Sequence, residues 1–328
     1  MNTRRAKEIQ GILAPLEDRL RRGVLGQEGL LRGLMVGLLA EGHILIEGVP
    51  GLGKTRAVHT LADACQLDFK RLQFTPDLLP SDVVGTRIYN QHEGQFEVVR
   101  GPVFAHFVLA DEINRAPAKV QSALLETMQE RQVTLGRETH RLPEPFLVFA
   151  TQNPIEQEGT YPLPEAQLDR FLLKLIVRYP KAEQEPEIVR LVLGEGSSDE
   201  ASKNDDGPSL DAEAVVSLQR ACRQVFLEDR LVRYITDLVQ ASRSPREHGL
   251  ELAPYIELGA SPRGSISLAR AAQATALIEG RDAATPSDVK AVAHQVLRHR
   301  ILTTYYADAE GVTSDKVVDE ILARIKVP

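Results

Sequence analysis

Gly48-Val49-Pro50-Gly51-Leu52-Gly53-Lys54-Thr55 matches the pattern G-x-x-x-x-G-K-[ST] in full, and this stretch decides the expected fold of the 328-residue chain. It follows a short apolar run, His43–Glu47, which predicts a buried strand, and it opens a helical pattern. Glycines let such a loop curl so that its N–H groups point at a phosphate, and the start of the helix adds a favourable dipole. Lys54 is then expected to bridge the outer phosphates of a nucleotide, and Thr55 to supply an oxygen to Mg²⁺.

Short apolar runs recur along the first half of the chain, with helical patterns between most of them. The expected strands are His43–Glu47, Phe69–Phe74, Phe104–Ala110, Phe146–Thr151 and Phe171–Val177. Alternation of strands and helices predicts an α/β fold with a mostly parallel sheet between helices. Two stretches break the alternation and are predicted to be hairpins: Ile88–Val98, which turns near Gly94, and Gln132–Thr139, which turns near Gly136.

Helical periodicity dominates the rest of the sequence. At the start, Pro15 interrupts a helical pattern from Ile9 to Leu20, which predicts a late start or a kink. Further helices are expected over Val215–Phe226, Leu231–Ser242, Ile266–Ile278 and Val289–His299, the last with a capping box from Thr285 to Asp288. We therefore expect an α/β nucleotide-binding domain over residues 1–180 and a helical domain over residues 181–328. Residues 194–208 are polar and acidic, which predicts a flexible loop.

Carboxylates and an amide follow two of the expected strands. Asp111 ends the run that begins at Phe104, and it can hold Mg²⁺ through water. The adjacent Glu112 can polarise the water that attacks a γ-phosphate, a role that favours an NTPase doing mechanical work over a kinase or GTPase. Asn153 follows the next strand and is expected beside the γ-phosphate.

Composition narrows the function classes. The net charge of −7 argues against broad, sequence-independent binding to nucleic acid or anionic membranes. Two cysteines exclude a disulfide framework and fit a reducing cytoplasm, and no apolar run has the length of a membrane span. The eight histidines are scattered, so we expect them to be structural rather than metal ligands.

The order of the motifs resembles that of the AAA+ ATPases, and within them the MoxR family of the helix-2-insert group. The matching segments are Gly26-Gln27, Gly48–Thr55, Asp111–Ala116, Leu124–Glu130, Thr151–Pro154, Gly159–Phe171 and Ser261–Arg263. The resemblance covers nearly the whole chain apart from the acidic loop, and the two hairpins match the insertions of that group.

The resemblance implies a P-loop NTPase with an AAA+ core, a C-terminal all-α lid domain, and ATP with Mg²⁺ as cofactors. It places Gly26 and Gln27 where an N-terminal linker meets adenine, and Asn153 at the sensor-1 position. It also implies that Arg170 is an arginine finger that reaches the γ-phosphate of a neighbouring subunit, and that Arg263 is the sensor-2 residue of the lid. Arg115 and Arg131 could also face a neighbour's nucleotide, and the sequence does not rank them.

Proteins similar to this one form homo-oligomeric rings, often hexameric, and act as chaperone-like remodellers with von Willebrand factor A domain partners. The alternative is an AAA+ motor or loader that acts on nucleic acid, which predicts basic hairpins; here the first hairpin is charge-mixed and the second mildly basic. A nucleotide-gated scaffold without hydrolysis is a third reading, and intact Lys54, Asp111, Glu112 and Asn153 argue against it.

Overall fold

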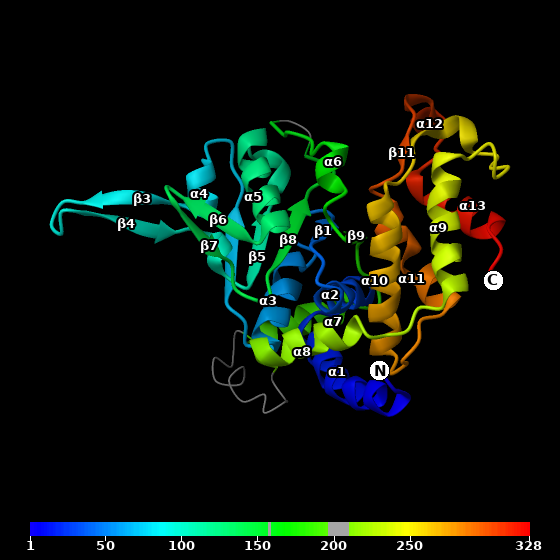
Figure 1. Ribbon diagram of the computed structural model, residues 1–328, viewed down its shortest axis with the longest axis horizontal. Helices are drawn as coiled ribbons and strands as arrows, with labels where there is room; N and C mark the ends of the chain where they lie inside the picture. The colour runs from blue at the N-terminus through cyan, green and yellow to red at the C-terminus, as the bar shows by residue number, and fades with distance from the viewer. Residues whose placement is uncertain (157–158, 196–209) are drawn as a thin grey trace.

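A parallel five-stranded sheet lies at the centre of the N-terminal half of the molecule (Figure 1). The computed structural model describes residues 1–156, 159–195 and 210–328, and it orders the strands β2-β5-β8-β1-β9. These strands are β1 (Ile44–Glu47), β2 (Phe69–Gln73), β5 (Phe107–Asp111), β8 (Leu147–Gln152) and β9 (Leu173–Ile176). Because β8 lies between β1 and β5, the carboxyl ends that carry the three polar motifs meet at one edge of the sheet. The predicted α/β class is confirmed.

Both faces of the three inner strands, β5, β8 and β1, are buried, and successive side chains of a strand enter different cores. Phe107 and Leu109 pack in the core that holds the helices α1 (Thr3–Gly23), α2 (Glu28–Leu39) and α3 (Lys54–Ala64). Val108 and Ala110 pack in the core under α5 (Ala118–Glu130). Burial on both faces explains why the strands read as apolar runs rather than as alternating patterns.

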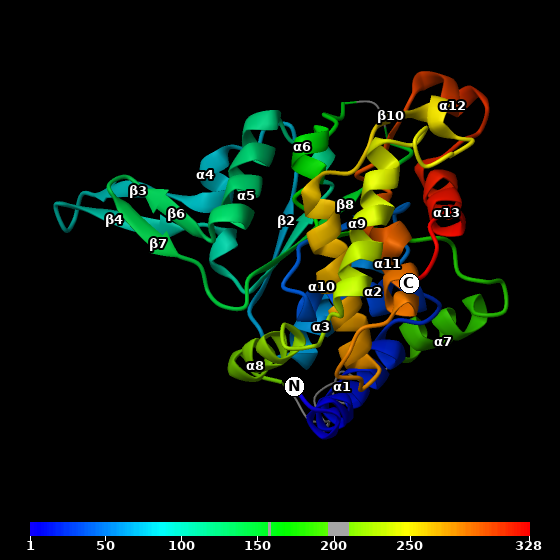
Figure 2. The same cartoon turned by 45° about the vertical axis from the view of Figure 1, so that its right-hand side comes forward.

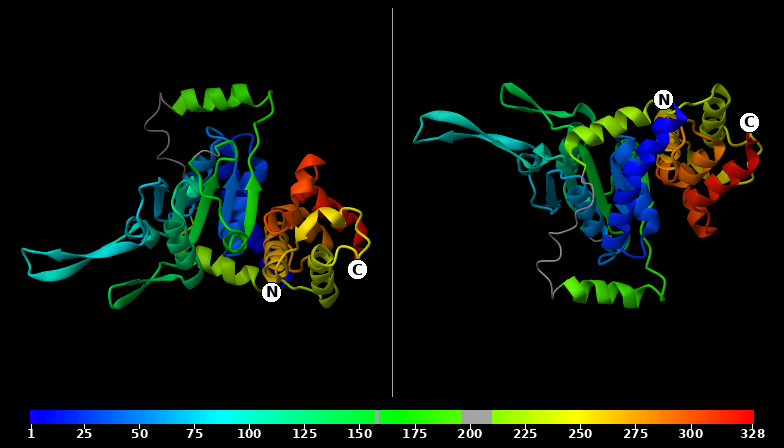
Figure 3. Two further views of the ribbon diagram at one scale, coloured as in Figure 1. Left: turned by 90° about the horizontal axis from the view of Figure 1, so that it is seen from above. Right: turned by 90° about the horizontal axis from the view of Figure 1, so that it is seen from below.

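Both predicted hairpins are present. β3 (Gly85–Asn90) pairs with β4 (Gln95–Arg100) after the short helix α4 (Pro80–Val84), and β6 (Gln132–Leu135) pairs with β7 (Glu138–Arg141). Figure 3 shows both hairpins projecting from the end of the molecule that faces away from the C-terminal helices. They leave the sheet edge free for the motifs described above.

The C-terminal part is helical and lies beside the sheet, as Figure 2 shows. The short helix α6 (Glu165–Leu168) precedes β9. The helices that follow β9 are α7 (Glu185–Glu195), α8 (Ala212–Cys222), α9 (Asp229–Arg243), α10 (Pro262–Ile278), α11 (Pro286–Leu297), α12 (Tyr305–Ala309) and α13 (Ser314–Arg324). A small antiparallel pair, β10 (Ile256–Leu258) and β11 (Leu302–Thr303), lies among them. The predicted capping box of Thr285 and Asp288 begins α11. In α8, the Gln219 side chain donates to the Leu38 carbonyl of α2 over 2.8 Å. The division at residue 180 stays a prediction.

Some predicted boundaries are wrong. Helix α1 begins at Thr3, because the Asn2 side chain accepts from the Arg5 N–H and a buried apolar stripe holds the whole helix across Pro15. Phe104 is not in a strand, since a 3₁₀ turn occupies Pro102–Phe104. Helix α8 ends at Cys222, and Phe226 instead forms a bridge with Ala283.

The predicted acidic loop, residues 194–208, lies outside the described residues from residue 196 onward. Within the part of the chain that is described, no helix combines the length and the apolar character that crossing a bilayer requires.

Candidate nucleotide-binding site

The glycine-rich loop lines a cavity of about 350 Å³ at the carboxyl edge of the sheet. Residues 50–56 form one wall, and Asp111, Glu112 and Asn153 form the other. Gly51 and Gly53 have φ of +82° and +76°, a left-handed conformation that favours glycine and lets the loop turn into α3. The structure therefore brings together the loop and the three polar residues that the sequence predicted for the phosphate site.

Lys54 points into this loop. Its Nζ donates to the carbonyl oxygens of Gly48 and Val49, the latter over 3.0 Å. Burial lowers the pKa of Lys54 from its ordinary value, and the negative charges of Asp111 and Glu112 act against that shift. The ammonium group is held where a phosphate in the loop would meet it.

Asp111 is a buried carboxylate with both oxygens in use. Oδ1 accepts from the Thr151 hydroxyl over 2.6 Å, and Oδ2 accepts from Nη2 of Arg71 over 2.6 Å. Thr55 lines the same cavity, so a hydroxyl and a carboxylate, the hard oxygen donors that Mg²⁺ prefers, face one space. These oxygen donors fit a Mg²⁺ ion, which Asp111 would hold through a water molecule.

Glu112 follows β5 with a φ of +56°, which is uncommon for a residue other than glycine and turns its side chain toward the cavity. Its Oε2 accepts from Gln73 over 2.8 Å and from Nη1 of Arg115 over 2.9 Å. Arg115, a candidate for contact with a neighbouring subunit, is therefore paired within its own chain.

Asn153 is also fixed within the cavity wall. Its Oδ1 accepts from the Ile155 N–H over 3.2 Å, and its amide donates to Glu156 over 3.4 Å. The side chain is buried at the end of β8, next to the edge where the loop and Asp111 meet. This location agrees with a residue that contacts the outer phosphate.

Sequence reasoning missed Arg71 and Gln73. Both lie on β2, and Gln73 is directly opposite Asp111 in the parallel register of β2 and β5. No local sequence pattern singles out these two residues, because polar residues are common at exposed strand positions. Only the strand order reveals that they face the carboxylates.

A second cavity, of about 550 Å³, adjoins the first and shares Pro50–Gly53 and Arg56 with it. Val24, Gln27 and Tyr179 line it together with apolar residues of α7. The Gln27 amide donates to the Arg178 carbonyl over 3.1 Å, which fixes it in the wall. Gly26 has a φ of +74°, and a Cβ there would lie 3.1 Å from Pro180, so the linker passes close to the start of the helical region. A largely apolar space beside a phosphate loop suits a nucleotide base.

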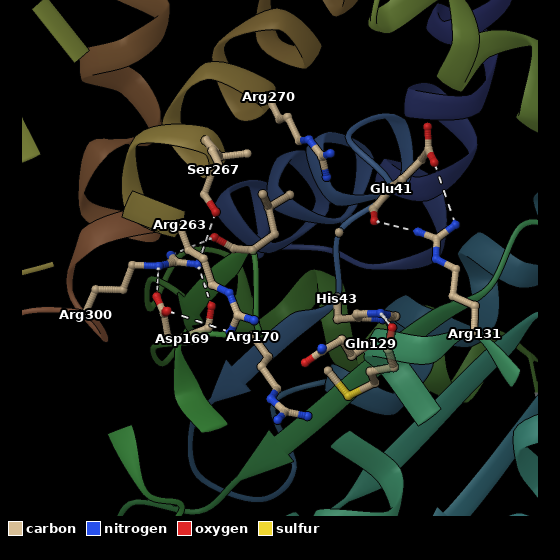
Figure 4. A pocket seen from close by; sticks show the side chains of 14 residues that line it. Glu41, His43, Gln129, Arg131, Asp169, Arg170, Arg263, Ser267, Arg270 and Arg300 are labelled. Atoms are coloured by element: carbon tan, nitrogen blue, oxygen red, sulfur yellow. Dashed lines mark hydrogen bonds and ion pairs between the residues drawn. The ribbon is translucent and has the colours of Figure 1, made fainter. Parts of the chain in front are cut away.

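Arg170 and Arg263 line a third cavity, of about 260 Å³, shown in Figure 4. Nη1 of Arg170 donates to the Leu125 carbonyl of α5 over 2.7 Å, and Nη1 of Arg263 lies 3.9 Å from Oδ2 of Asp169. Arg131 lines the same cavity, with its guanidinium 3.7 Å from the Glu41 carboxylate. Neither Arg170 nor Arg263 is among the described residues that line the two cavities at the glycine-rich loop.

Comparison with known proteins agrees with this geometry. Residues 43–173 match the ATPase family associated with various cellular activities (AAA), and residues 251–321 match the AAA lid domain. Chaperone MoxR1 of Mycobacterium tuberculosis is 47% identical over 310 residues, which span 94% of this chain and 80% of that protein. Protein MoxR of Paracoccus denitrificans is 34% identical over 95% of each chain. This chain belongs to the MoxR family of AAA+ ATPases.

A solved structure supports the same assignment. A putative ATPase from Cytophaga hutchinsonii is 46% identical, and it superposes with a TM-score of 0.88 over 98% of this chain and 97% of that one. The MoxR-family chain is thus a nucleotide-binding ATPase with an AAA+ core and a helical lid, as the motifs predicted. Members of this family are generally oligomeric.

Proposed function

We propose that the chain is a chaperone-like remodeller of protein complexes that hydrolyses ATP in a homo-oligomeric ring, with each active site shared between two subunits. The observation that carries this proposal is the separation of Arg170 and Arg263 from the cavity that holds Lys54. Negative charge spreads over the γ-phosphate in the transition state, and an arginine that stabilises it contributes about 10³–10⁵ in rate.

The arginines at the cavity of the same chain have other partners. Arg71 is bonded to Asp111, and Nε of Arg56 donates to the Gly23 carbonyl over 2.6 Å. Arg170 and Arg263 stand together in a cavity that also holds the side chain of Arg270. A concentration of guanidinium groups with few carboxylates suits the phosphates of a bound nucleotide, and the neighbouring subunit of a ring would supply them.

We call the cavity at the glycine-rich loop, which holds Lys54 of the same chain, the cis cavity. Its residues would take separate roles. Lys54 would bridge the outer phosphates, and Asn153 would hold the γ-phosphate. Thr55 and Asp111 would hold Mg²⁺, which when bound neutralises charge on the phosphates. Glu112 would leave Gln73 and orient the attacking water through its carboxylate. Gly26 and Gln27 would shape the adenine end, which completes a site for ATP.

The hairpin of β3 and β4 supports a protein client. Ile88, Tyr89 and Phe96 are exposed on it, and the rings of Tyr89 and Phe96 are 5.3 Å apart. Its charges are mixed in sign, which suits a protein surface better than a phosphate backbone. The proposal also includes a partner with a von Willebrand factor A domain. It further includes a hexameric ring, and both parts rest on membership of the family.

A cytoplasmic location is also part of the proposal. Cys65 and Cys222 are buried free thiols, and burial raises the pKa of each to about 12. Thiols in this state are unreactive and need no oxidising compartment.

The client can be identified with a form of the protein that stays loaded with ATP. Full-length Glu112→Gln serves as bait with ATP and Mg²⁺, and Lys54→Ala, which should not load, serves as the matched control. We expect a protein with a von Willebrand factor A domain to be retained by the first variant alone. Retention of nucleic acid instead, with a several-fold rise in wild-type ATPase rate on adding DNA or RNA, would support the nucleic-acid motor.

A further inference from the structure

Arg300 is a buried cation that connects the lid to the segment that carries the arginine finger. It follows α11, and its side chain is only 2% exposed. We define residues 169–172 as the finger loop. Arg300 donates from Nε to Oδ1 of Asp169 over 2.9 Å, from Nη2 to the Phe171 carbonyl over 2.5 Å, and from Nη1 to the Leu172 carbonyl over 3.2 Å. One guanidinium group thus holds three residues of the finger loop.

Asp169 continues this connection to the start of α10. Its Oδ2 accepts from the Ser261 hydroxyl over 2.8 Å, and Ser261 caps the helix by accepting from the Arg263 N–H over 3.1 Å. Figure 4 shows the result: Arg300 and Arg263 approach Asp169 together, while the Arg170 side chain leaves the same loop toward the open cavity. Arg170 and Arg263 are therefore attached to one buried ion pair.

The pair is held from both domains. Arg300 also donates from Nη2 to the Ser267 hydroxyl of α10 over 3.1 Å and from Nη1 to the Val296 carbonyl of α11. Beside it, the His299 ring contacts the Phe171 carbonyl over 3.1 Å. Burial lowers the pKa of Arg300 to about 10, and the adjacent Asp169 acts against that shift, so the group stays charged at neutral pH. The lid end of this connection cannot turn without moving the finger loop.

We propose that Arg300 is a positioning residue for the shared active site: by fixing the finger loop to the lid, it makes Arg170 and Arg263 approach the neighbour's γ-phosphate as one unit. This inference rests on the proposed function. Arg300 is not expected to touch the nucleotide, because its donors are already satisfied within the chain. A rotation of the lid would carry both arginines together.

The first test removes the connection. Arg300→Met should leave the affinity for a fluorescent ATP analogue within about twofold of wild type, because the cis cavity is untouched. Its turnover should fall by about 10- to 100-fold, since a displacement of about 1 Å in a catalytic group can cost about 100-fold in rate. Arg300→Lys keeps the charge but cannot span three acceptors. Its turnover should therefore lie between that of wild type and that of Arg300→Met. It goes through every measurement as the second variant, so that a methionine variant that fails to fold does not decide the result.

A matched control comes from the same turn. Arg298 pairs with Asp315 over 2.9 Å and does not contact Asp169. Arg298→Met removes a lid arginine of similar setting and should keep turnover within about threefold of wild type. An equal loss in Arg298→Met would overturn the proposal, because the defect would then follow from any damage to this end of the lid.

Mixing experiments separate positioning from general damage. An Arg300→Met subunit keeps Glu112, and a Glu112→Gln subunit keeps an intact finger loop, so a 1:1 mixture should regain activity at roughly a quarter of its interfaces. A mixture of Arg300→Met with Arg170→Ala should show no activity above that of the two variants alone, because neither subunit offers a properly placed finger. A subunit that is merely misfolded would rescue neither.

Besides an equal loss in Arg298→Met, three outcomes overturn the proposal: normal turnover by both Arg300 variants, activity in the mixture with Arg170→Ala above that of the two variants alone, or no rescue by Glu112→Gln of a variant that binds the analogue normally. The failure of the proposed function looks different. In that case a mixture of Arg170→Ala and Glu112→Gln shows no rescue, independently of the turnover measured for the Arg300 variants.

Discussion

Lys54 and Arg170 line separate cavities of one chain, although both are expected to act on the same phosphate. The Lys54 ammonium group lies against the carbonyls of its own loop, whereas the Arg170 guanidinium donates to the Leu125 carbonyl of α5 over 2.7 Å. In the proposed function, a second copy of the chain brings its Arg170 to the nucleotide that Lys54 of the first copy binds. The proposed function therefore predicts that the ATPase activity depends on assembly.

Lys54→Ala should abolish tight binding of ATP. The ammonium group is the cation that points into the glycine-rich loop, and one hydrogen bond to a charged group contributes about 1.5–3 kcal/mol. We expect affinity to fall by at least about 10- to 100-fold. Calorimetric titration of the variant with ATP and Mg²⁺ measures this directly, and an unchanged dissociation constant would remove Lys54 from the phosphate site.

Glu112→Gln should bind ATP with Mg²⁺ and fail to turn it over. The amide cannot polarise water, and general base catalysis contributes about 10²–10⁴ in rate. The amide can still contact Gln73, so the fold of the loop should persist. Phosphate release together with the titration above distinguishes this variant from Lys54→Ala. Turnover at the wild-type rate would exclude Glu112 as the base.

The buried His43 should make the fold sensitive to acid. Its Nδ1 accepts from the Val148 N–H over 2.9 Å, so the folded chain needs the neutral ring, and burial lowers its pKa to about 4. The unfolded chain keeps the ordinary pKa of 6.5. Between these two values the unfolded chain binds more protons, so the free energy of unfolding is complete above about pH 6.5 and falls as the pH drops toward 4.

Urea unfolding at about pH 7.5 and about pH 5 tests this expectation, with His43→Asn as the variant that cannot titrate. Wild type should lose about 2 kcal/mol through His43 between these conditions, at 1.36 kcal/mol for each pKa unit. His299, whose pKa is also lowered by burial, adds to the loss in both proteins. The variant should therefore lose less than wild type, and equal losses in the two proteins would contradict the assignment of His43.

Much of the fold could be predicted from local sequence signals. The glycine-rich loop, the capping box at Thr285 and the hairpin turn at Gly136 were predictable, because each depends on a few adjacent residues with special backbone or capping chemistry. Boundaries were harder where tertiary packing decided them, as at Pro15, where a buried apolar stripe holds the helix across the proline.

The parts that could not be predicted depend on contacts between distant residues. Arg71 meets Asp111 through the order of two strands, and Arg300 meets Asp169 across 131 positions of sequence. A polar side chain in a strand or after a helix carries no sign of its eventual partner. The cavity that holds Arg263 likewise follows from the placement of the lid beside the finger loop.

A mixture of Arg170→Ala and Glu112→Gln subunits tests the shared active site most directly. Each variant alone should be nearly inactive, the first because loss of such an arginine costs about 10³–10⁵ in rate. An Arg170→Ala subunit keeps Glu112, and a Glu112→Gln neighbour still offers Arg170, so roughly a quarter of the interfaces in a random 1:1 mixture are complete. We predict ATPase activity in the mixture well above the sum of the two parents. If the subunits demonstrably exchange and the mixture stays inactive, while Arg170→Ala alone turns over ATP normally, the shared site is wrong.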